Sequence, residues 1–186
     1  MTPKTEPAYY AISVVGPDRP GIVAGVSEAL FRLGCNIADS SCAMLAGEFA
    51  MILIVSHPRP VNQARILETL KPACDALSLT LALRTLHTGE QTRKTPEGEI
   101  CQITVYGADQ PGIVYKVTNA LAARKINIMD LQTKLVGTPQ QPVYVMLLEA
   151  TLPDTVTVEE TESLLYGLRE ELGIEIKVRI VTPVEL

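Results

Sequence analysis

The chain has 186 residues, of which 47% are hydrophobic and 20% are charged, a balance typical of a globular protein. Its net charge of −5 and its pI of about 5.1 argue against direct binding to nucleic acid, which favours basic surfaces. The longest apolar run, residues 49–55, is too short to span a membrane, and the N-terminus lacks the apolar core of a secretion signal. We therefore predict a cytoplasmic protein that contacts neither membrane nor nucleic acid.

The first half of the chain predicts the order strand, helix, strand, strand, helix, strand. Apolar and β-branched runs mark the strands, and apolar residues at helical spacing mark the helices. Pro72 inside the second helix predicts a kink or an early end there. The predicted elements are a strand over 9–15, a helix from Pro20 to Gly34, strands over 37–45 and 48–56, a helix over 64–77 and a strand over 78–86.

The second half repeats the first at a spacing of 91 residues. The segment from Gly16 to Val23 returns as Gly107 to Val114, and Asn36-Ile37 returns as Asn127-Ile128. A self-similarity of this kind indicates one small module used twice. The predicted elements are strands over 99–106, 127–136, 143–151 and 174–181, helices over 111–124 and 158–172, and a turn over 137–142 that is longer than Ala46-Gly47. A Thr157-x-x-Glu160 capping box opens the second of these helices.

This element order predicts an α+β protein made of two ferredoxin-like modules. Each module would be a four-stranded antiparallel sheet with both helices on one face. We predict domains over 8–87 and 99–182, joined by a polar linker over 88–98. The uncovered face of each sheet needs a partner, and the sibling module is the obvious candidate.

Enzymatic chemistry finds little support in the sequence. Neither His57 nor His87 has a histidine at the matching position of the other module, and the common metal, esterase and phosphate-binding motifs are absent from the chain. The four cysteines show no C-x-x-C spacing, which favours buried thiols over a metal or redox site. We therefore predict no enzyme activity, no catalytic residue, no metal and no cofactor.

The Pro-Gly turn that occurs in both modules is the best candidate site. Gly21 and Gly112 at the helix entrances would let a ligand approach unpaired backbone N–H groups, which attract a carboxylate. Asp18 and Asp109 would lie beside them and would hold an ammonium group. The pattern thus fits a small zwitterion, but an Asp before Pro-Gly is also a common turn and cap, and an Asn after a helix is also a common left-handed end residue.

The motif Asp18-Arg19-Pro20-Gly21, with Asn36-Ile37 after the helix, resembles the ACT domain, and so does its second copy. This resemblance implies a ferredoxin-like module that binds an amino acid between modules and regulates a partner. The residues that it assigns to ligand binding are Asp18, Arg19, Pro20, Gly21, Asn36 and Ile37 in the first copy, and Asp109, Gln110, Pro111, Gly112, Asn127 and Ile128 in the second. Arg19 adds a guanidinium that Gln110 does not match, so we favour the first copy if one site acts.

A tandem pair of this length also resembles the glycine cleavage system transcriptional repressor family. That resemblance implies control of glycine and one-carbon genes by protein–protein contact, with glycine or serine as ligand, another regulatory protein as partner, and a homo-oligomer as the working form. The alternative is an oligomeric interaction scaffold without a small ligand, in which the Pro-Gly turns are purely structural.

Overall fold

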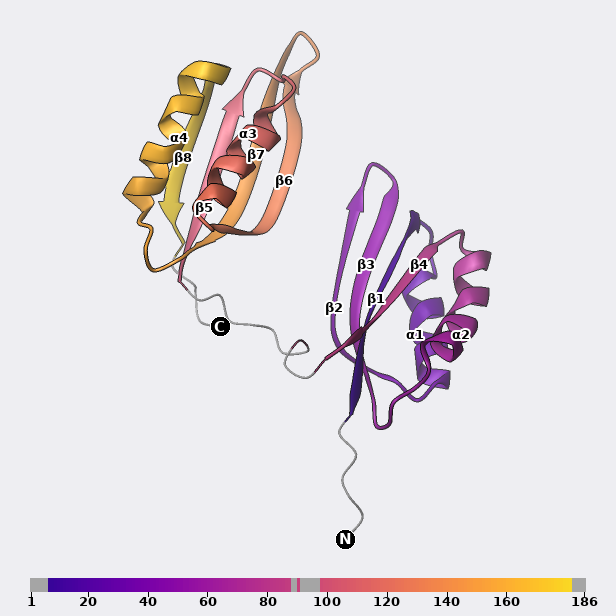
Figure 1. Ribbon diagram of the computed structural model, residues 1–186. Helices are drawn as coiled ribbons and strands as arrows, with labels where there is room; N and C mark the ends of the chain where they lie inside the picture. Colours follow the sequence, from indigo (N-terminus) through magenta and orange to yellow (C-terminus); the bar gives the residue numbers. More distant parts are fainter. Residues whose placement is uncertain (1–6, 88–89, 91–97, 182–186) are drawn as a thin grey trace. The chain divides into compact units, whose positions relative to one another are not determined.

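The computed structural model describes residues 7–87, 90 and 98–181. These residues form two compact units, and the chain divides between Arg93 and Lys94. In each unit two helices cover one face of a sheet (Figure 1). Most of the predicted linker, residues 88–89 and 91–97, lies outside the described residues, as does residue 182 of the predicted second domain.

The first unit is one antiparallel sheet in the order β2-β3-β1-β4. Its alternating strands and its two amphipathic helices confirm the predicted ferredoxin-like arrangement. The elements are β1 (Ala8–Pro17), α1 (Ile22–Arg32), β2 (Asn36–Leu45), β3 (Glu48–His57), α2 (Gln63–Ala76) and β4 (Thr80–Leu86).

The second unit repeats this topology in the order β6-β7-β5-β8. The two sheets therefore have the same strand connections, which confirms the internal repeat. The elements are β5 (Glu99–Gly107), α3 (Ile113–Ala123), β6 (Asn127–Thr138), β7 (Gln141–Leu152), α4 (Val158–Leu172) and β8 (Ile174–Ile180).

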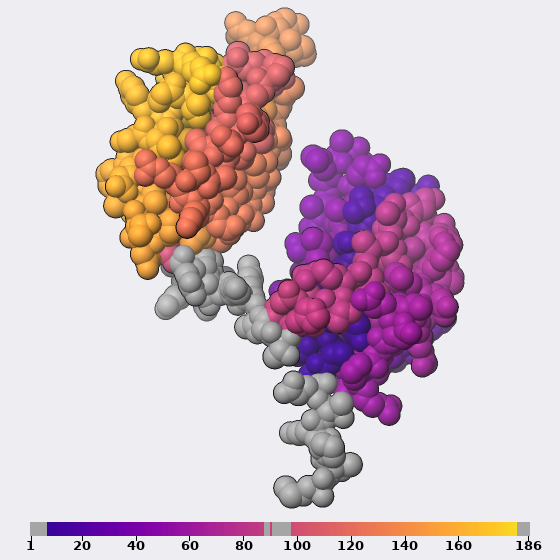
Figure 2. Space-filling view, viewed as in Figure 1, coloured from indigo at the N-terminus to yellow at the C-terminus, as the bar shows by residue number. Residues whose placement is uncertain are grey.

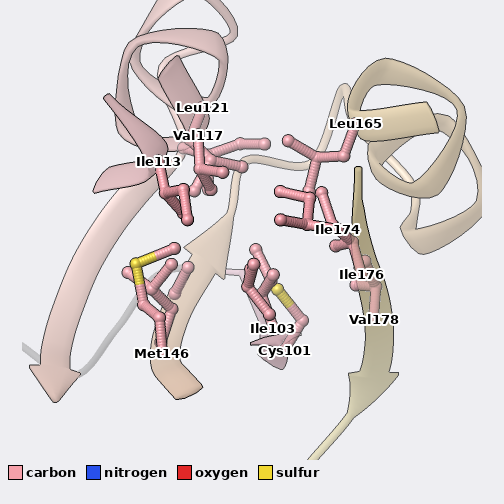
Figure 3. Packing of buried hydrophobic residues seen from close by; sticks show 14 of the residues in the cluster. Cys101, Ile103, Ile113, Val117, Leu121, Met146, Leu165, Ile174, Ile176 and Val178 are labelled. Carbon is pink, nitrogen blue, oxygen red and sulfur yellow. The ribbon is translucent and has the colours of Figure 1, made fainter. Parts of the chain in front are cut away.

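Each unit has its own aliphatic core between its sheet and its helices. In the second unit Ile103 of β5 and Met146 of β7 face Val117 of α3 and Leu165 of α4, as Figure 3 shows. In the first, alternate residues of β1 such as Ile12 are fully buried against the helices. A fully buried aliphatic side chain contributes about 1.5–3 kcal/mol, so two separate cores imply two separately stabilised units.

Helix α2 continues through Pro72 to Ala76, so of the two predicted outcomes, a kink or an early end, the early end does not occur. Leu70 and Cys74, on either side of the proline, are buried in the core. Their packing outweighs the backbone hydrogen bond that proline removes.

The two hairpins differ in strand length and not in turn length. Ala46-Gly47 joins β2 to β3, and a two-residue turn at Pro139-Gln140 joins β6 to β7. Pairing continues through Gly137–Pro142 and Thr138–Gln141, so four residues of the predicted six-residue turn are paired strand. The tip of this longer hairpin projects beyond the body of its unit, as Figure 2 shows.

Strands β2 and β6 are exposed edges. Every residue of β2 is exposed, and in β6 only Ile128 is half-buried. Helix α2 packs on β4 and helix α4 packs on β8, which are the edge strands opposite β2 and β6. Exposed edges of this kind offer unpaired backbone groups to another strand.

The sheet faces that point away from the helices differ in character. In the first unit this face carries small and apolar residues such as Ala11 and Ser13, with Ile52 57% exposed. In the second unit it carries Lys177, whose Nζ lies 5.4 Å from the ring centre of Tyr106. The partner predicted for these faces stays a prediction.

Candidate ligand-binding site

The Pro-Gly turns have the same unusual backbone in both units. Gly21 and Gly112 have φ angles of 96° and 98°, in the left-handed region that glycine adopts readily and other residues avoid. A Cβ added to Gly21 would meet nothing within 4 Å. Glycine is therefore required here by the backbone conformation, and the space above the turn is open to a ligand.

The helices that follow these turns begin without a side-chain cap. Neither α1 nor α3 has a capping hydrogen bond or an acidic residue in its first turn. Helix α2, in contrast, is capped by the Asn62 side chain, and α4 has the predicted capping box of Thr157 and Glu160. In each unit the first-turn N–H groups at the Pro-Gly turn thus stay available to an external anion.

The Asp18 carboxylate does not cap the helix, and no hydrogen bond to it occurs within residues 7–87, 90 and 98–181. Its backbone N–H donates to the Gly47 carbonyl at 2.8 Å. This bond ties the Pro-Gly turn to the tip of the β2–β3 hairpin. The simple capping interpretation of Asp18 therefore finds no support, and an exposed acid stands beside a helix N-terminus.

Arg19 and Gln110 have different surroundings. The Gln110 side chain is partly buried and donates to the Leu172 carbonyl at the end of α4. Arg19 is exposed and forms no ion pair with the described part of the chain. The first copy therefore offers a free guanidinium, whereas the second uses its amide to hold its own structure.

The second copy has polar groups that the sequence prediction missed. Burial raises the pKa of Tyr144 above its ordinary value, a hydrogen bond with Thr133 opposes this effect, and the nearby Asp109 carboxylate adds to it. Because Tyr144 pairs with Gly107 on β5, its counterpart beside Gly16 is the apolar Phe49. The longer hairpin shifts the spacing between copies by four residues, which hid this substitution at a fixed offset of 91.

Asn36 and Asn127 are extended strand residues, so the alternative of a left-handed helix end is wrong for them. The left-handed positions are Gly34 and Lys125, with φ angles of 75° and 58°. The pairing register shifts soon after each asparagine, between Ile37 and Asp39 and between Ile128 and Asp130. This shared irregularity turns the start of the edge strand in the same way in both copies.

Within one unit the structure does not bring Asp18 and Asn36 together. Asp18 follows Pro17, which pairs with Glu48 at the start of β3, whereas Asn36 pairs with Ser56 near its end. Eight residues of strand separate those positions, about 26 Å. Asp109 and Asn127 are separated in the same manner, because β6 and β7 repeat this register. In each unit the two groups of candidate residues therefore lie at opposite ends of the sheet.

The described residues contain neither a cluster of metal ligands nor a membrane-spanning helix. No group of three His, Cys, Asp or Glu side chains in these ranges is placed to hold a metal ion. No helix in them is long and apolar enough to cross a membrane. The Pro-Gly turns are the candidate site because their uncapped helix N-termini suit a carboxylate and the nearby acid suits an ammonium group.

Comparison with known proteins identifies relatives over nearly the whole chain. The sequence profile of the ACT domain matches residues 9–84 and 99–179. The glycine cleavage system transcriptional repressor of Escherichia coli (strain K12) is 26% identical over 175 residues, which cover 93% of this chain and 90% of the relative.

Two solved structures share the whole architecture. An unknown protein from Galdieria sulphuraria superposes with a TM-score of 0.79 at 29% identity, covering 95% of this chain and all of the other. A putative glycine cleavage system transcriptional repressor superposes with a TM-score of 0.74 at 22% identity, covering 96% of this chain and all of the other. The second likeness is one of fold alone.

Proposed function

Because this chain belongs to the ACT domain family, with one domain in each half, we propose that it is a regulatory protein that binds a small amino acid and acts on a partner protein. The observation that carries the proposal is the uncapped helix N-terminus at each Pro-Gly turn, beside Asp18 and Asp109. Both other helices satisfy their first turns with their own side chains. The first-turn N–H groups of α1 and α3 can therefore donate to a carboxylate of a ligand.

We propose glycine or serine as the ligand. The carboxylate would accept from the first-turn N–H groups of α1, and Asp18 would hold the ammonium group. Arg19 would add a second donor to the carboxylate. In the second copy Gln110 is engaged by Leu172, so we expect the first copy to bind more tightly.

A second ACT module completes the site in this proposal. Asn36 lies at the far end of β2 from the Asp18 turn, so it cannot serve the ligand of its own module. Antiparallel pairing of the exposed β2 edge with that of another copy would place Asn36 and Ile37 of one beside the Asp18 turn of the other. Ligand binding and oligomerisation would then support each other.

The relative from Escherichia coli suggests the biological role. Its name describes a transcriptional repressor of the glycine cleavage system, and it matches this chain from one domain to the other. We propose that this protein likewise controls glycine and one-carbon genes in the cytoplasm, through contact with a regulatory protein and without catalysis. The net charge of −5 favours such an indirect route over direct contact with DNA.

A thermal-shift panel of the twenty amino acids tests this proposal. One site at 100 times its Kd adds about 2.7 kcal/mol, which raises Tm by several degrees for a domain of this size. We expect glycine or serine to raise Tm, and Asp18→Ala and Asn36→Ala to abolish the shift. The control is Glu68→Ala, which removes an exposed acid from α2 of the same unit.

The scaffold alternative predicts a different result. A ligand-free scaffold would remain oligomeric in gel filtration and would show no shift with any amino acid. Retained shifts in both site variants would overturn the site assignment, and a flat panel would overturn the sensor proposal.

A further inference from the structure

The first unit has a basic cavity at the end away from its Pro-Gly turn. The cavity has a volume of about 620 Å³, a size that suits a small-molecule ligand. It lies between the end of β3 and the start of α2. Its lining residues are Leu33, His57, Arg59, Pro60, Val61, Asn62 and Arg65.

We propose that this cavity binds a small multivalent oxyanion, a phosphate ester or a polycarboxylate, through Arg59 and Arg65. The lining contains two arginines and a histidine but no acidic residue. Neither arginine forms an ion pair within the ranges that the structure covers. Two guanidinium groups without an internal counterion can bind an oxyanion with several charge-assisted hydrogen bonds. This proposal is independent of amino-acid binding at the Pro-Gly turns.

The wall of the cavity is fixed by hydrogen bonds to the core. The hydroxyl of the buried Tyr10 accepts from the Val61 N–H at 2.7 Å and donates to the Val61 carbonyl at 2.8 Å. His57 Nδ1 lies 2.5 Å from the Arg59 carbonyl oxygen and 3.1 Å from the Arg59 backbone nitrogen, and this contact holds the loop after β3. Because the backbone of this loop is held on both sides, the two arginines start from a preorganised frame.

In the second unit, the positions that correspond to Arg59 and Arg65 carry carboxylates of the protein itself. Counted from the helix N-caps, Asn62 and Thr157, Arg59 corresponds to Asp154 and Arg65 to Glu160. The Glu160 carboxylate accepts from the Thr157 N–H at 3.0 Å and so completes the capping box. At the matching place in the first unit a carboxylate is replaced by arginine. The internal anion is therefore absent there, and the surrounding charge is reversed.

Calorimetric titration of the full chain with inorganic phosphate, pyrophosphate and citrate tests the proposal. We expect binding of at least one of them to one site in each chain. The double variant Arg59→Gln/Arg65→Gln should weaken it by about tenfold or more. The matched control Lys71→Gln/Arg84→Gln removes the same charge from the first unit, outside the cavity, and should retain binding. Tighter binding of pyrophosphate indicates a phosphate ester as the source, and tighter binding of citrate a polycarboxylate.

A second variant separates lost binding from lost folding. Arg65→Glu would place a carboxylate three residues after Asn62 and rebuild the reciprocal half of the capping box. We expect this variant to lose anion binding while its Tm stays equal or rises. Absence of binding in the wild-type chain, equal loss in both double variants, or retained binding in Arg65→Glu would each overturn the proposal. Asp18→Ala should leave anion binding unchanged.

Discussion

At the scale of single residues, two glycines of the second unit have opposite roles. Gly112 has a φ of 98°, where an added Cβ is strained, whereas Gly167 lies within α4 with nothing within 4 Å of an added Cβ. We expect Gly112→Ala to lower the free energy of unfolding by about 1–2 kcal/mol. We expect Gly167→Ala to raise it by about 0.5–1 kcal/mol. Urea unfolding of the second unit measures the change in unfolding free energy for both substitutions. Changes of equal size and sign would contradict the opposite roles of the two glycines.

We expect Tyr144 to make the stability of the second unit depend on pH. Burial raises its pKa in the folded protein, so its contribution to stability is present below the ordinary tyrosine pKa of about 10 and is lost as the pH rises through the folded-state value. We expect stability to fall less between pH 9 and pH 11 in Tyr144→Phe than in the wild type. Urea unfolding at both pH values measures the difference. If the difference in unfolding free energy between Tyr144→Phe and the wild type is the same at both pH values, Tyr144 does not titrate differently on folding.

At the scale of elements, the edge strand β2 contrasts with the strands inside the sheets. Cys42 is exposed on β2, whereas Cys101 on β5 is buried and burial raises its pKa. A higher pKa and restricted access both lower the supply of reactive thiolate. At pH 8 we expect iodoacetamide to modify Cys42 first and Cys101 only after the unit opens.

Peptide mass spectrometry over time measures these labelling rates, and labelling in urea is the control in which all four cysteines react. Equal rates in the folded protein would contradict the burial assignment. Slower labelling of Cys42 with glycine or serine present would support the proposed pairing of β2 edges.

Most of the elements were predictable from local patterns, and the exceptions have physical reasons. Alternating apolar residues and the Thr157-x-x-Glu160 capping box identified strands and the start of α4. Pro72 was misleading because helix packing outweighs one lost hydrogen bond. The pairing of Gly137 with Pro142 was missed because these residues favour turns and only the register across the hairpin reveals the strand.

The candidate site was predictable in composition but not in geometry. The sequence placed Gly21 at the helix entrance as a point where a ligand can approach the backbone, but its left-handed conformation was not predicted. Asn36 lies about 26 Å along the sheet from the Asp18 turn. This separation depends on the strand register, which no local sequence pattern contains. The hydrogen bond of Gln110 to Leu172 joins residues 62 apart in the chain, so it required the folded structure.

At the scale of the whole molecule, the acidic charge belongs to one half. The unit up to Arg93 has eight basic and eight acidic residues, whereas the unit from Lys94 onward has eight basic and thirteen acidic ones. Because each has its own core, we expect residues 1–93 and 94–186 to fold as separate proteins. Circular dichroism would measure their folding, and anion exchange should retain only the second half strongly. An unfolded half would show that the units depend on each other.

The two similar copies must be kept apart while the chain folds. Repeated domains with similar sequences risk exchanging strands while they fold. The longer β6–β7 hairpin does not prevent this exchange, because residues 141–143 of β7 pair with β6 but not with β5 and would keep those pairs in either sheet. The distinction has to come from side chains that differ between the copies, such as Phe49, which pairs with Gly16, and Tyr144, which pairs with Gly107.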